Sequence, residues 1–403
     1  MLWLGIGIIL VAFAIAWPAV LVIGPKIVSR VGRHRPQCMD PLALLGDRPP
    51  KVSVLIAARN EQDGIGARLD NLFALEVPPG GLEIVVVSDG STDATADIVR
   101  ERIARCPPDR TLRLFEQHPN QGKEVALSVA AKEATGDIFA LTDATTEWRP
   151  DVALRLIEGL SQPGVGAASG RVVYRDADGG VADAFAAYQA FVVAQRRRSR
   201  NIQVSTSGAC AAAWACCFER FTPTVNSDLQ LAMLAAEQGL GTVYVDDAIA
   251  VEDTRVSLDE ELRARMRIAR RCLVSGPPLV RRLVAAGAWW PLLQLALQKW
   301  TRWAIWFPAA AGLLGLFLIA AGSDGILRAV ALGAALGALG IYGLGWLRVQ
   351  GRIAEGMRWL DALAYLVVGI VSTWRAAEQI ARGQRSLTWT PERPTTPPMG
   401  SAT

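Results

Sequence analysis

The stretch that decides the fold begins with the apolar run VSVLIAAR (residues 52–59), which is followed by the helical pattern NEQDGIGARLDNLFAL (60–75). A second apolar run, LEIVVVSD (82–89), comes next, and the stretch ends with GKEVALSVAAKEATGDIFALTDATTEW (122–148). Apolar, β-branched runs separated by helical patterns indicate βαβ units, so we predict an α/β fold built on a parallel sheet. In such sheets ligands lie beyond the carboxyl ends of the strands, where Asp89 and Asp143 fall. We therefore expect two acidic residues to face one pocket.

The composition indicates a membrane protein. Hydrophobic residues make up 51% of the 403 residues, and the mean hydropathy of +0.25 is high for a soluble protein of this size. The uncharged run from Leu2 to Ile23 is about as long as the roughly 20 residues that cross a bilayer. No basic region precedes it, so we expect an anchor rather than a cleaved signal. The positive-inside rule places the rest of the chain in the cytoplasm, because four basic residues follow this run: Lys26, Arg30, Arg33 and Arg35.

Charge and cysteine content favour neither a nucleic-acid-binding protein nor a disulfide-bonded one. The net charge is only +4, and the basic residues cluster beside apolar segments, so we expect no nucleic acid as partner. The six cysteines show no C-x-x-C spacing, which fits free thiols in a reducing cytoplasm. For Cys216 and Cys217 we favour a packing role over lipidation or metal binding.

The chain divides into a Pro-rich linker, a globular part long enough for one core, and an apolar C-terminal part. In the C-terminal part, Trp289 and Trp290 lie beside basic residues, as in a helix that lies in the headgroup zone. We predict an N-terminal anchor (1–25), a linker (26–49), a globular domain (50–278), a basic interfacial helix (279–302), C-terminal membrane helices (303–376) and a Pro/Thr-rich tail (377–403).

The last apolar segment leaves the membrane topology open. Two spans, from Trp303 to Ala321 and from about Ile326 to Leu347, precede it. Only Ala362 to Trp374 is uncharged, which as a helix reaches about 20 Å against a hydrocarbon core of about 30 Å. If this segment crosses, the tail lies outside, yet the basic residues of the tail favour the inside.

The second half of the globular part contains further elements. We predict strands at VGAASGRVVY and TVYVDDAIAV, a helix from Val181 into the run QRRRSR (195–200), and a helix from Asp228 to Gln238 that Gly239 ends. The run QRRRSR reads as a basic surface.

Three residues of the first half could bind a nucleotide. Asp89 ends a strand and could accept hydrogen bonds from a base or ribose; alternatively, with Ser91 and Asp93, it forms an Asx turn that caps the next helix. Lys123 follows Gly122 at a helix start, where backbone N–H groups favour an anion. Asp143 ends the strand IFALTD and could hold a divalent cation that bridges two phosphates, or cap the following helix. There is no Walker motif and no GxGxxG, which weighs against NAD.

Taken together, the motifs resemble the membrane-bound family 2 glycosyltransferases. The motifs are PKVSVLIAARNE, VVVSDGSTDAT, NQGKEVAL, ALTDAT, SDLQL and a basic helix before membrane spans. This group includes cellulose, hyaluronan and poly-N-acetylglucosamine synthases and ceramide glucosyltransferases. The resemblance covers nearly the whole chain and implies a GT-A nucleotide-sugar domain.

The resemblance assigns donor-binding roles to several residues. Asp89 resembles the aspartate that recognises uracil, with Ala57 and Glu61 beside it. Lys123 resembles the lysine near the diphosphate, and Asp143 the first aspartate of a metal-binding DxD motif. Thr145 stands at the third position of that motif, so one carboxylate is missing. A divalent cofactor, Mg²⁺ or Mn²⁺, is implied, but with a weakened site.

The resemblance also suggests a catalytic base. Asp228 in VNSDLQLAML resembles the aspartate of a TED-like motif, which takes the proton of the acceptor hydroxyl in inverting enzymes. The alternative is that Asp228 caps a helix or is an acid in its first turn. The resemblance also places the loop STSGAC, with Ser207 and Gly208, where family members have a small-residue loop under the acceptor site.

A basic helix follows, in which only one arginine of the family's Gln-x-x-Arg-Trp motif remains, Arg267. Four arginines fall on one face of this helix and could contact the diphosphate, anionic lipid or solvent: Arg263, Arg267, Arg270 and Arg271. Ile268 replaces the tryptophan that belongs to the polymer channel in processive synthases. This replacement favours transfer of one or a few sugars.

We therefore expect a multi-pass protein of a bacterial-type inner membrane with a cytoplasmic catalytic domain. The expected activity is inverting transfer of a sugar from a nucleotide donor, most simply a UDP-sugar, to a lipid-type or glycan acceptor at the bilayer. Two alternatives stay open. One is a processive polysaccharide synthase. The other is a nucleotide-sugar-binding partner of an envelope-assembly complex without turnover.

Overall fold

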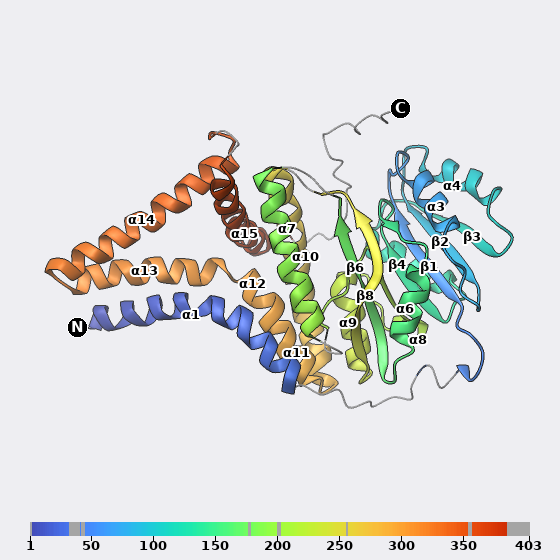
Figure 1. Cartoon of the computed structure of the whole chain (residues 1–403), viewed down its shortest axis with the longest axis horizontal. Coiled ribbons are helices and arrows are strands. Elements are labelled where there is room, and N and C mark those ends of the chain that lie inside the picture. Colours follow the sequence, from blue (N-terminus) through green and yellow to red (C-terminus); the bar gives the residue numbers. More distant parts are fainter. Residues whose placement is uncertain are drawn as a thin grey trace.

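The computed structural model describes residues 2–31, 41, 45–175, 179–199, 203–254, 257–353 and 357–384. In this part of the chain, an α/β domain lies beside a group of long helices that extend away from it (Figure 1). Much of the predicted linker, most of the predicted tail, Cys38 and Arg200 lie outside the described residues.

A sheet of eight strands runs through the described part of the domain in the order β3-β2-β1-β4-β7-β6-β8-β5. Its strands are β1 (Val52–Ala58), β2 (Leu82–Asp89), β3 (Arg110–Gln117), β4 (Ile138–Thr142), β5 (Glu147–Trp148), β6 (Val165–Tyr174), β7 (Ala211–Trp214) and β8 (Gly241–Glu252). Together with its helices, this sheet confirms the predicted α/β class.

The prediction of a parallel sheet is correct for β1 to β4 and for the pairing of β6 with β8. In the second half β7 runs antiparallel to β4 and β6, and β5 runs antiparallel to β8. The reason lies in α7 (Gly180–Arg198), which follows β6. It packs against α10 and α15 through Val181 and Phe185 instead of crossing back over the sheet, so the chain re-enters the sheet from the opposite end.

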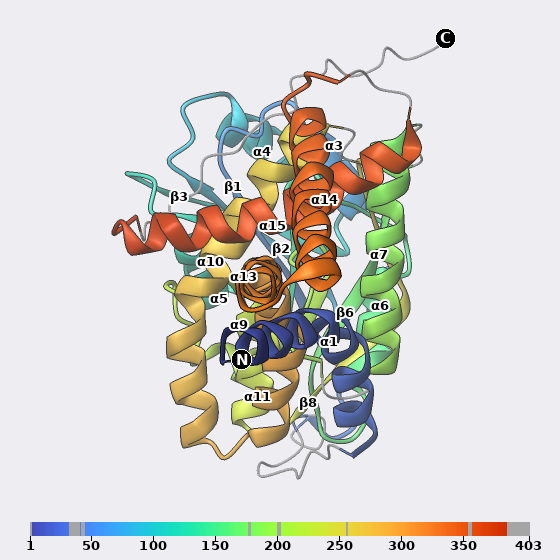
Figure 2. The ribbon, with the colours of Figure 1, turned by 90° about the vertical axis from the view of Figure 1, so that its left-hand side faces the viewer.

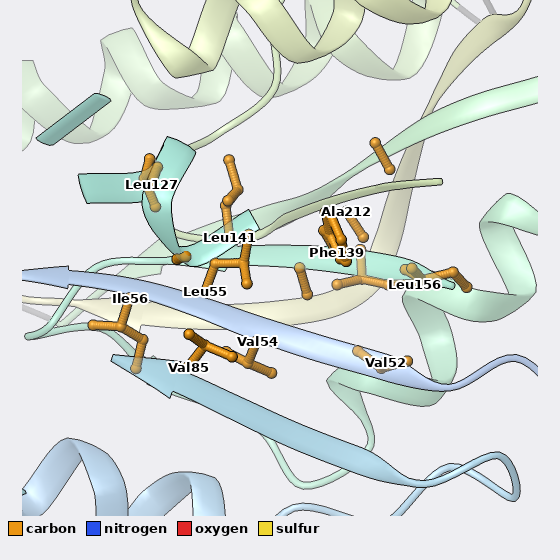
Figure 3. Packing of buried hydrophobic residues seen from close by; sticks show 14 of the residues in the cluster. Val52, Val54, Leu55, Ile56, Val85, Leu127, Phe139, Leu141, Leu156 and Ala212 are labelled. Atoms are coloured by element: carbon orange, nitrogen blue, oxygen red, sulfur yellow. The ribbon is translucent and has the colours of Figure 1, made fainter. Parts of the chain in front are cut away.

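The core lies around the first four strands. Every residue of β1, β2 and β4 is buried, as expected for parallel strands that are covered on both faces. Figure 3 shows Val54, Leu55 and Val85 of this core packed with Leu127 and Leu156 from the covering helices. Burying each such side chain contributes about 1.5–3 kcal/mol, so this half is a rigid support for the strand ends.

The helices of the domain connect these strands. They are α3 (Ile65–Phe73), α4 (Thr95–Ile103), α5 (Lys123–Glu133), α6 (Val152–Leu160), α7, α8 (Ala215–Phe218), α9 (Ser227–Glu237) and α10 (Leu258–Ala285). The predicted domain boundary at residue 278 falls inside α10, which continues through Pro277 and Pro278. This helix is not interrupted there because Cys272, Leu279 and Leu283 bury its face on both sides of the prolines.

The long apolar helices form a separate group. They are α1 (Leu2–Val31), α11 (Trp289–Leu295), η1 (Ala296–Trp300), α12 (Thr301–Trp303), α13 (Trp306–Gly322), α14 (Gly325–Val349) and α15 (Arg358–Ala381). Among the described residues, three helices are long and apolar enough to cross a membrane, namely α1, α14 and α15. A fourth crossing arises if Trp289–Trp303 and Trp306–Gly322, which meet at 60°, form one broken span.

Glycines bring α1 and α13 close together along their length (Figures 1 and 2). A Cβ at Gly7 would lie 2.6 Å from the carbonyl oxygen of Gly315, and one at Gly312 would lie 2.8 Å from Ala14 Cβ. Small residues at such contacts are typical of helices that pack within lipid. The indole Nε1 of Trp17 also donates to the carbonyl of Thr301 (3.1 Å), which ties α1 to α12.

Candidate active site

The carboxylate of Asp89 fixes the loop that leads into α5. Its Oδ1 accepts hydrogen bonds from Gln117 Nε2 (2.6 Å) and the N–H of Gln121 (2.7 Å), and its Oδ2 accepts one from the N–H of Gly122 (2.8 Å). Gly122 has a φ of 102°, which glycine adopts without strain. Asp89 is 1% exposed, so it acts here as a support that positions Lys123.

Asp89 does not cap the helix that follows it. The N-cap of α4 is Ala94, and the side chain that contacts the start of this helix is Asp93, whose Oδ1 accepts a hydrogen bond from the N–H of Thr95 (3.0 Å). Ser91 instead connects two loops, because its hydroxyl accepts from the N–H of Asn60 (3.2 Å). The Asx-turn alternative therefore applies to Asp93 and leaves the carboxylate of Asp89 for the α5 loop.

The ammonium group of Lys123 joins acidic residues from distant parts of the chain. It forms an ion pair with Asp143 at the end of β4 and interacts electrostatically with Asp228 at the start of α9. Burial by itself lowers the pKa of a lysine, but the two carboxylates outweigh burial and raise the pKa of Lys123. Lys123 therefore keeps its positive charge, and 16% of its side chain remains exposed.

Three cations keep Asp143 ionised. Burial would raise the pKa of Asp143, but Lys123, helped by Arg267 and Arg68, lowers it. Arg68 is 3% exposed; its Nη2 donates to Thr142 Oγ1 (2.7 Å), and its guanidinium lies 5.1 Å from the ring centre of Trp148. Burial lowers the pKa of Arg68 to about 9, so it remains a cation at neutral pH.

Asp228 lies in the first turn of α9, with its carboxylate directed toward Lys123. The N-cap of α9 is Asn226, whose Oδ1 accepts from the N–H of Asp228 (2.9 Å). Within the described chain, the Asp228 carboxylate makes no hydrogen bond, so it can accept one from a ligand. Burial raises the pKa of Asp228; Lys123 opposes this effect and Asp143 adds to it.

Gly208 allows this approach. A Cβ at position 208 would lie 2.5 Å from Asp228 Oδ1 and 3.4 Å from Lys123 Nζ. The N–H of Thr206 donates to the Asp228 carbonyl (2.8 Å), and the N–H of Ser207 donates to Ser169 Oγ (3.1 Å), so the loop is held from both sides. The small-residue loop therefore contacts Asp228 directly.

The four arginines on one face of α10 have different surroundings. Arg267 interacts electrostatically with Asp143, and Arg271 pairs with the buried Glu124 (3.3 Å). By contrast, Arg270 donates to Gln379 of α15 (3.5 Å), and Arg263 pairs with Asp259 at the exposed start of the helix. Only Arg267 and Arg271 therefore reach the α5 side of the cluster.

The remaining predicted donor residues lie in loops next to this cluster. Ala57 is buried near the end of β1, and the backbone N–H of Glu61 donates a hydrogen bond to Thr95 Oγ1 (2.8 Å). Thr145 is exposed, and its methyl carbon lies 3.6 Å from the position that a Cβ of Gly64 would occupy. These loops border the carboxyl ends of β1, β2 and β4.

Sequence reasoning missed several buried charges. Arg68, Glu124 and Lys299 carried no local signal, because their partners come from other elements. The interpretation of QRRRSR as a basic surface was wrong for Arg196: its Nη2 donates to the carbonyl of Thr206 (3.4 Å), and its guanidinium lies over Tyr244. Arg197 does lie at the surface, where it pairs with Asp246.

The cluster fits a phosphorylated ligand better than a metal held by protein alone. The N-terminus of α5, Lys123 and Arg267 supply positive charge at one place. No group of three or more metal-ligating side chains occurs among the described residues, and Asp143 is the carboxylate available beside Thr145. One carboxylate suits a Mg²⁺-like ion that takes its other ligands from phosphates and water. The residues therefore fit a cation that arrives with a diphosphate.

The fold and this cluster define a GT-A domain, the nucleotide-sugar-binding fold of glycosyltransferases. Residues 53–221 match the family model described as Glycosyl transferase family 2. The chain therefore carries a family 2 glycosyltransferase domain, in agreement with the resemblance noted from its motifs.

Individual relatives support this assignment. A beta-monoglucosyldiacylglycerol synthase of Nostoc sp. is 34% identical over 118 residues, which are 29% of this chain and 25% of that protein. An N-acetylglucosaminyltransferase of Sinorhizobium fredii is 26% identical over 238 residues, 55% of this chain and 57% of that protein. The matches thus span about a quarter to just over half of these relatives.

The fold also matches a solved structure over most of its length. A mannosyltransferase from Pyrobaculum calidifontis, solved in complex with GDP-Man and Mn²⁺, superposes with a TM-score of 0.61 at 24% identity. The match covers 92% of this chain and 99% of that one. The shared arrangement therefore includes the long helices as well as the GT-A domain.

We predict that Gly208→Ala displaces the Asp228 carboxylate. A misplacement of roughly 1 Å can cost about 100-fold in rate, so kcat for sugar transfer should fall by at least about tenfold with little change in UDP affinity. Radiolabelled transfer in membranes and UDP calorimetry on the purified chain measure the two effects. Gly276→Ala is the matched control, because its Cβ meets nothing nearer than Trp300 Nε1 at 3.8 Å. Equal activity of both variants would contradict the placement of Asp228.

Proposed function

We propose that the protein is an inverting glycosyltransferase that moves a sugar from a nucleotide donor, a UDP-sugar, to a lipid-type acceptor at the membrane. The observation that carries the proposal is the convergence of Lys123, Asp143 and Asp228 at the carboxyl edge of the sheet. These residues provide an anion site and, beside it, a carboxylate without a hydrogen bond.

In the proposed mechanism the donor diphosphate lies at the N-terminus of α5. Lys123 and Arg267 compensate the charge that develops on the leaving group as the bond from C1 to phosphate breaks. A divalent cation held by Asp143 would supply further positive charge there when bound. Asp89 acts on the base side by fixing the Gln121–Gly122 loop.

Asp228 is the proposed general base. Its carboxylate accepts the proton of the acceptor hydroxyl while that oxygen attacks C1 from the face opposite the diphosphate. A single displacement of this kind inverts the anomeric centre. Because Lys123 lies between Asp143 and Asp228, the donor and acceptor sides of the reaction share one positive charge.

The acceptor class follows from the surroundings of α10. Ile268 is 43% exposed at the position where the resemblance expects a tryptophan of a polymer channel. This favours addition of one or a few sugars to a lipid. The Nostoc relative is named for such a product, beta-monoglucosyldiacylglycerol. Another relative is named poly-beta-1,6-N-acetyl-D-glucosamine synthase, so a processive synthase is the second candidate, which a polymer ladder among the products would identify.

We also propose a membrane topology in which α15 lies on the cytoplasmic surface. One side of α15 is buried against the domain: Tyr365 donates to Glu261 Oε1 (3.1 Å), and Arg265 lies 4.2 Å from the Tyr365 ring centre. The opposite side exposes Trp359 (62%), Leu366 (64%) and Trp374 (48%) in one stripe. Figure 2 shows α15 running across the view while α13 is seen end-on. This arrangement is typical of an interfacial helix.

For the base, we predict that Asp228→Asn lowers transfer by about 10²–10⁴-fold while UDP still binds with wild-type affinity.

The pH dependence of the wild type gives a second prediction. Only the ionised form of Asp228 accepts a proton, and burial raises its pKa. Wild-type activity should therefore fall on acidification at a higher pH than an ordinary aspartate would give. Assays with radiolabelled UDP-sugars across pH test both points. Turnover retained in the variant would remove Asp228 as base, and absence of turnover in the wild type alongside UDP binding would favour the assembly-partner alternative.

For the metal, we expect EDTA to reduce transfer and added Mg²⁺ or Mn²⁺ to restore it, because a single protein carboxylate must share the ion with the donor phosphates. Asp143→Ala should raise the metal concentration needed for half-maximal activity about tenfold or more. Full activity of the wild type in EDTA would show that Lys123 and Arg267 suffice.

For the topology, we expect a reporter fused after Gln384 to lie in the cytoplasm. A reporter that works only in the cytoplasm should therefore be active at this position. If α1, α13 and α14 cross and α15 does not, both ends of α15 stay on the cytoplasmic side. A reporter inserted between Ser323 and Asp324, in the turn that joins α13 to α14, is the matched control and should report the opposite side. Alkaline phosphatase activity of the Gln384 fusion would show that α15 crosses.

A further inference from the structure

A second group of positive charges lies on the membrane side of Asp228. Arg196 comes from the last turn of α7, Lys299 from η1 and Arg302 from α12. Lys299 interacts electrostatically with both arginines, and Lys299 and Arg196 each interact with the Asp228 carboxylate. The donor-side mechanism uses none of the three.

The position of Arg196 follows from the loop that holds Asp228. Its guanidinium donates to the carbonyl of Thr206, whose own N–H donates to the carbonyl of Asp228. Gln203 Nε2 donates to the carbonyl of Arg196 (2.6 Å), which fixes the end of α7 beside the same loop. Arg196 is therefore built into the acceptor side of the site.

The position of Lys299 follows from a π-helical turn. Such turns contain an extra residue and often occur at functional sites. Gln294 of α11 and Gln298 of η1 both donate to Ser199 Oγ (3.3 and 2.7 Å), which connects these two helical segments to the end of α7. Leu295 and Trp303 pack in one cluster with residues of α9 and α10, so this side of the turn faces the domain.

The negative charge around these three cations does not balance their positive charge. In the ranges that the structure describes, none of them forms an ion pair, and Lys299 makes no hydrogen bond through Nζ. Arg302 donates to Tyr188 (3.4 Å) and to the carbonyl of Gln298, both neutral groups. Largely desolvated cations are costly unless an anion pairs with them, and guanidinium and ammonium groups together suit phosphate.

The group also lies where a lipid headgroup arrives. η1 and α12 lead directly into α13, and Trp17 of α1 bonds to Thr301 between Lys299 and Trp303. Arg196, Lys299 and Arg302 are partly exposed, so a ligand can reach them. A phosphate held there would place the rest of its molecule between Asp228 and the apolar helices.

We propose that Arg196, Lys299 and Arg302 bind the phosphate of a lipid acceptor and thereby present its hydroxyl to Asp228. The proposal rests on the proposed function, since it names the acceptor class of the same site: a lipid that carries a phosphate group. It separates two anion sites, with the donor diphosphate at Lys123 and Arg267 and the acceptor phosphate on the other side of Asp228.

The test uses the purified full-length chain and two lipid probes with the same acyl chains. Phosphatidic acid carries a phosphate monoester and diacylglycerol carries none. Native mass spectrometry from detergent measures binding of each lipid, and calorimetry measures binding of UDP. We expect at least tenfold tighter binding of phosphatidic acid than of diacylglycerol, and competition by inorganic phosphate only at far higher concentrations.

Variants locate the site. Lys299→Met and Arg196→Met should each weaken binding of phosphatidic acid at least tenfold and leave UDP affinity within about twofold. Arg198→Met is the matched control, because Arg198 lies two residues away on α7 and is exposed. A thermal unfolding transition shows whether each variant is folded. If one of the two variants does not fold, the other still tests the proposal.

Four outcomes would overturn the inference. They are equal binding of the two lipids, an equal loss in Arg198→Met, loss of UDP binding in the Lys299 and Arg196 variants, and displacement by inorganic phosphate at the concentration of the lipid. The first outcome with intact UDP binding refutes only this inference. Failure of the wild type to bind UDP or any UDP-sugar refutes the proposed function itself.

Discussion

The arrangement of the site depends on one ammonium group held between two carboxylates. Lys123 pairs with Asp143 and attracts Asp228, although the three residues lie on α5, at the end of β4 and on α9. In a largely desolvated place each of these charges would be unfavourable alone, so their mutual attraction stabilises the approach of the α9 region to the parallel half of the sheet. Gly208 favours this approach because a Cβ at position 208 would lie 2.5 Å from Asp228 Oδ1.

Under the proposed function, the same constraint would bring a membrane acceptor and a nucleotide donor together. The parallel half of the domain, with Asp89, Lys123 and Arg68, provides the donor side. The other side is formed by the ends of α7, α9 and η1, which connect through Ser199 and Trp17 to the long apolar helices. Asp228 lies where these two parts join. The proposed base at this junction would reach a hydroxyl on a bilayer lipid as well as a sugar held at the sheet edge.

Much of the fold and part of the site were predictable from sequence. Residues at strand ends and helix starts, such as Asp143, Lys123 and Asp228, stand out because local pattern fixes where they lie. The strand β3 was missed because RTLRLFEQ forms a half-exposed edge strand with charges along it. Arg196 and Lys299 were missed or misread because their surroundings come from elements far away in the chain. The antiparallel entry of β7 likewise depends on how α7 packs, which its own residues do not show.

An experimental structure of the full-length chain with bound UDP tests the central claim most directly. The account predicts that the diphosphate lies at the N-terminus of α5, within hydrogen-bond distance of Lys123, with the Asp228 carboxylate facing the position of the sugar. The contrary result would be a diphosphate bound elsewhere, for example in the cavity of about 480 Å³ between β6 and α7 that Arg171, Arg175 and Arg197 help to line.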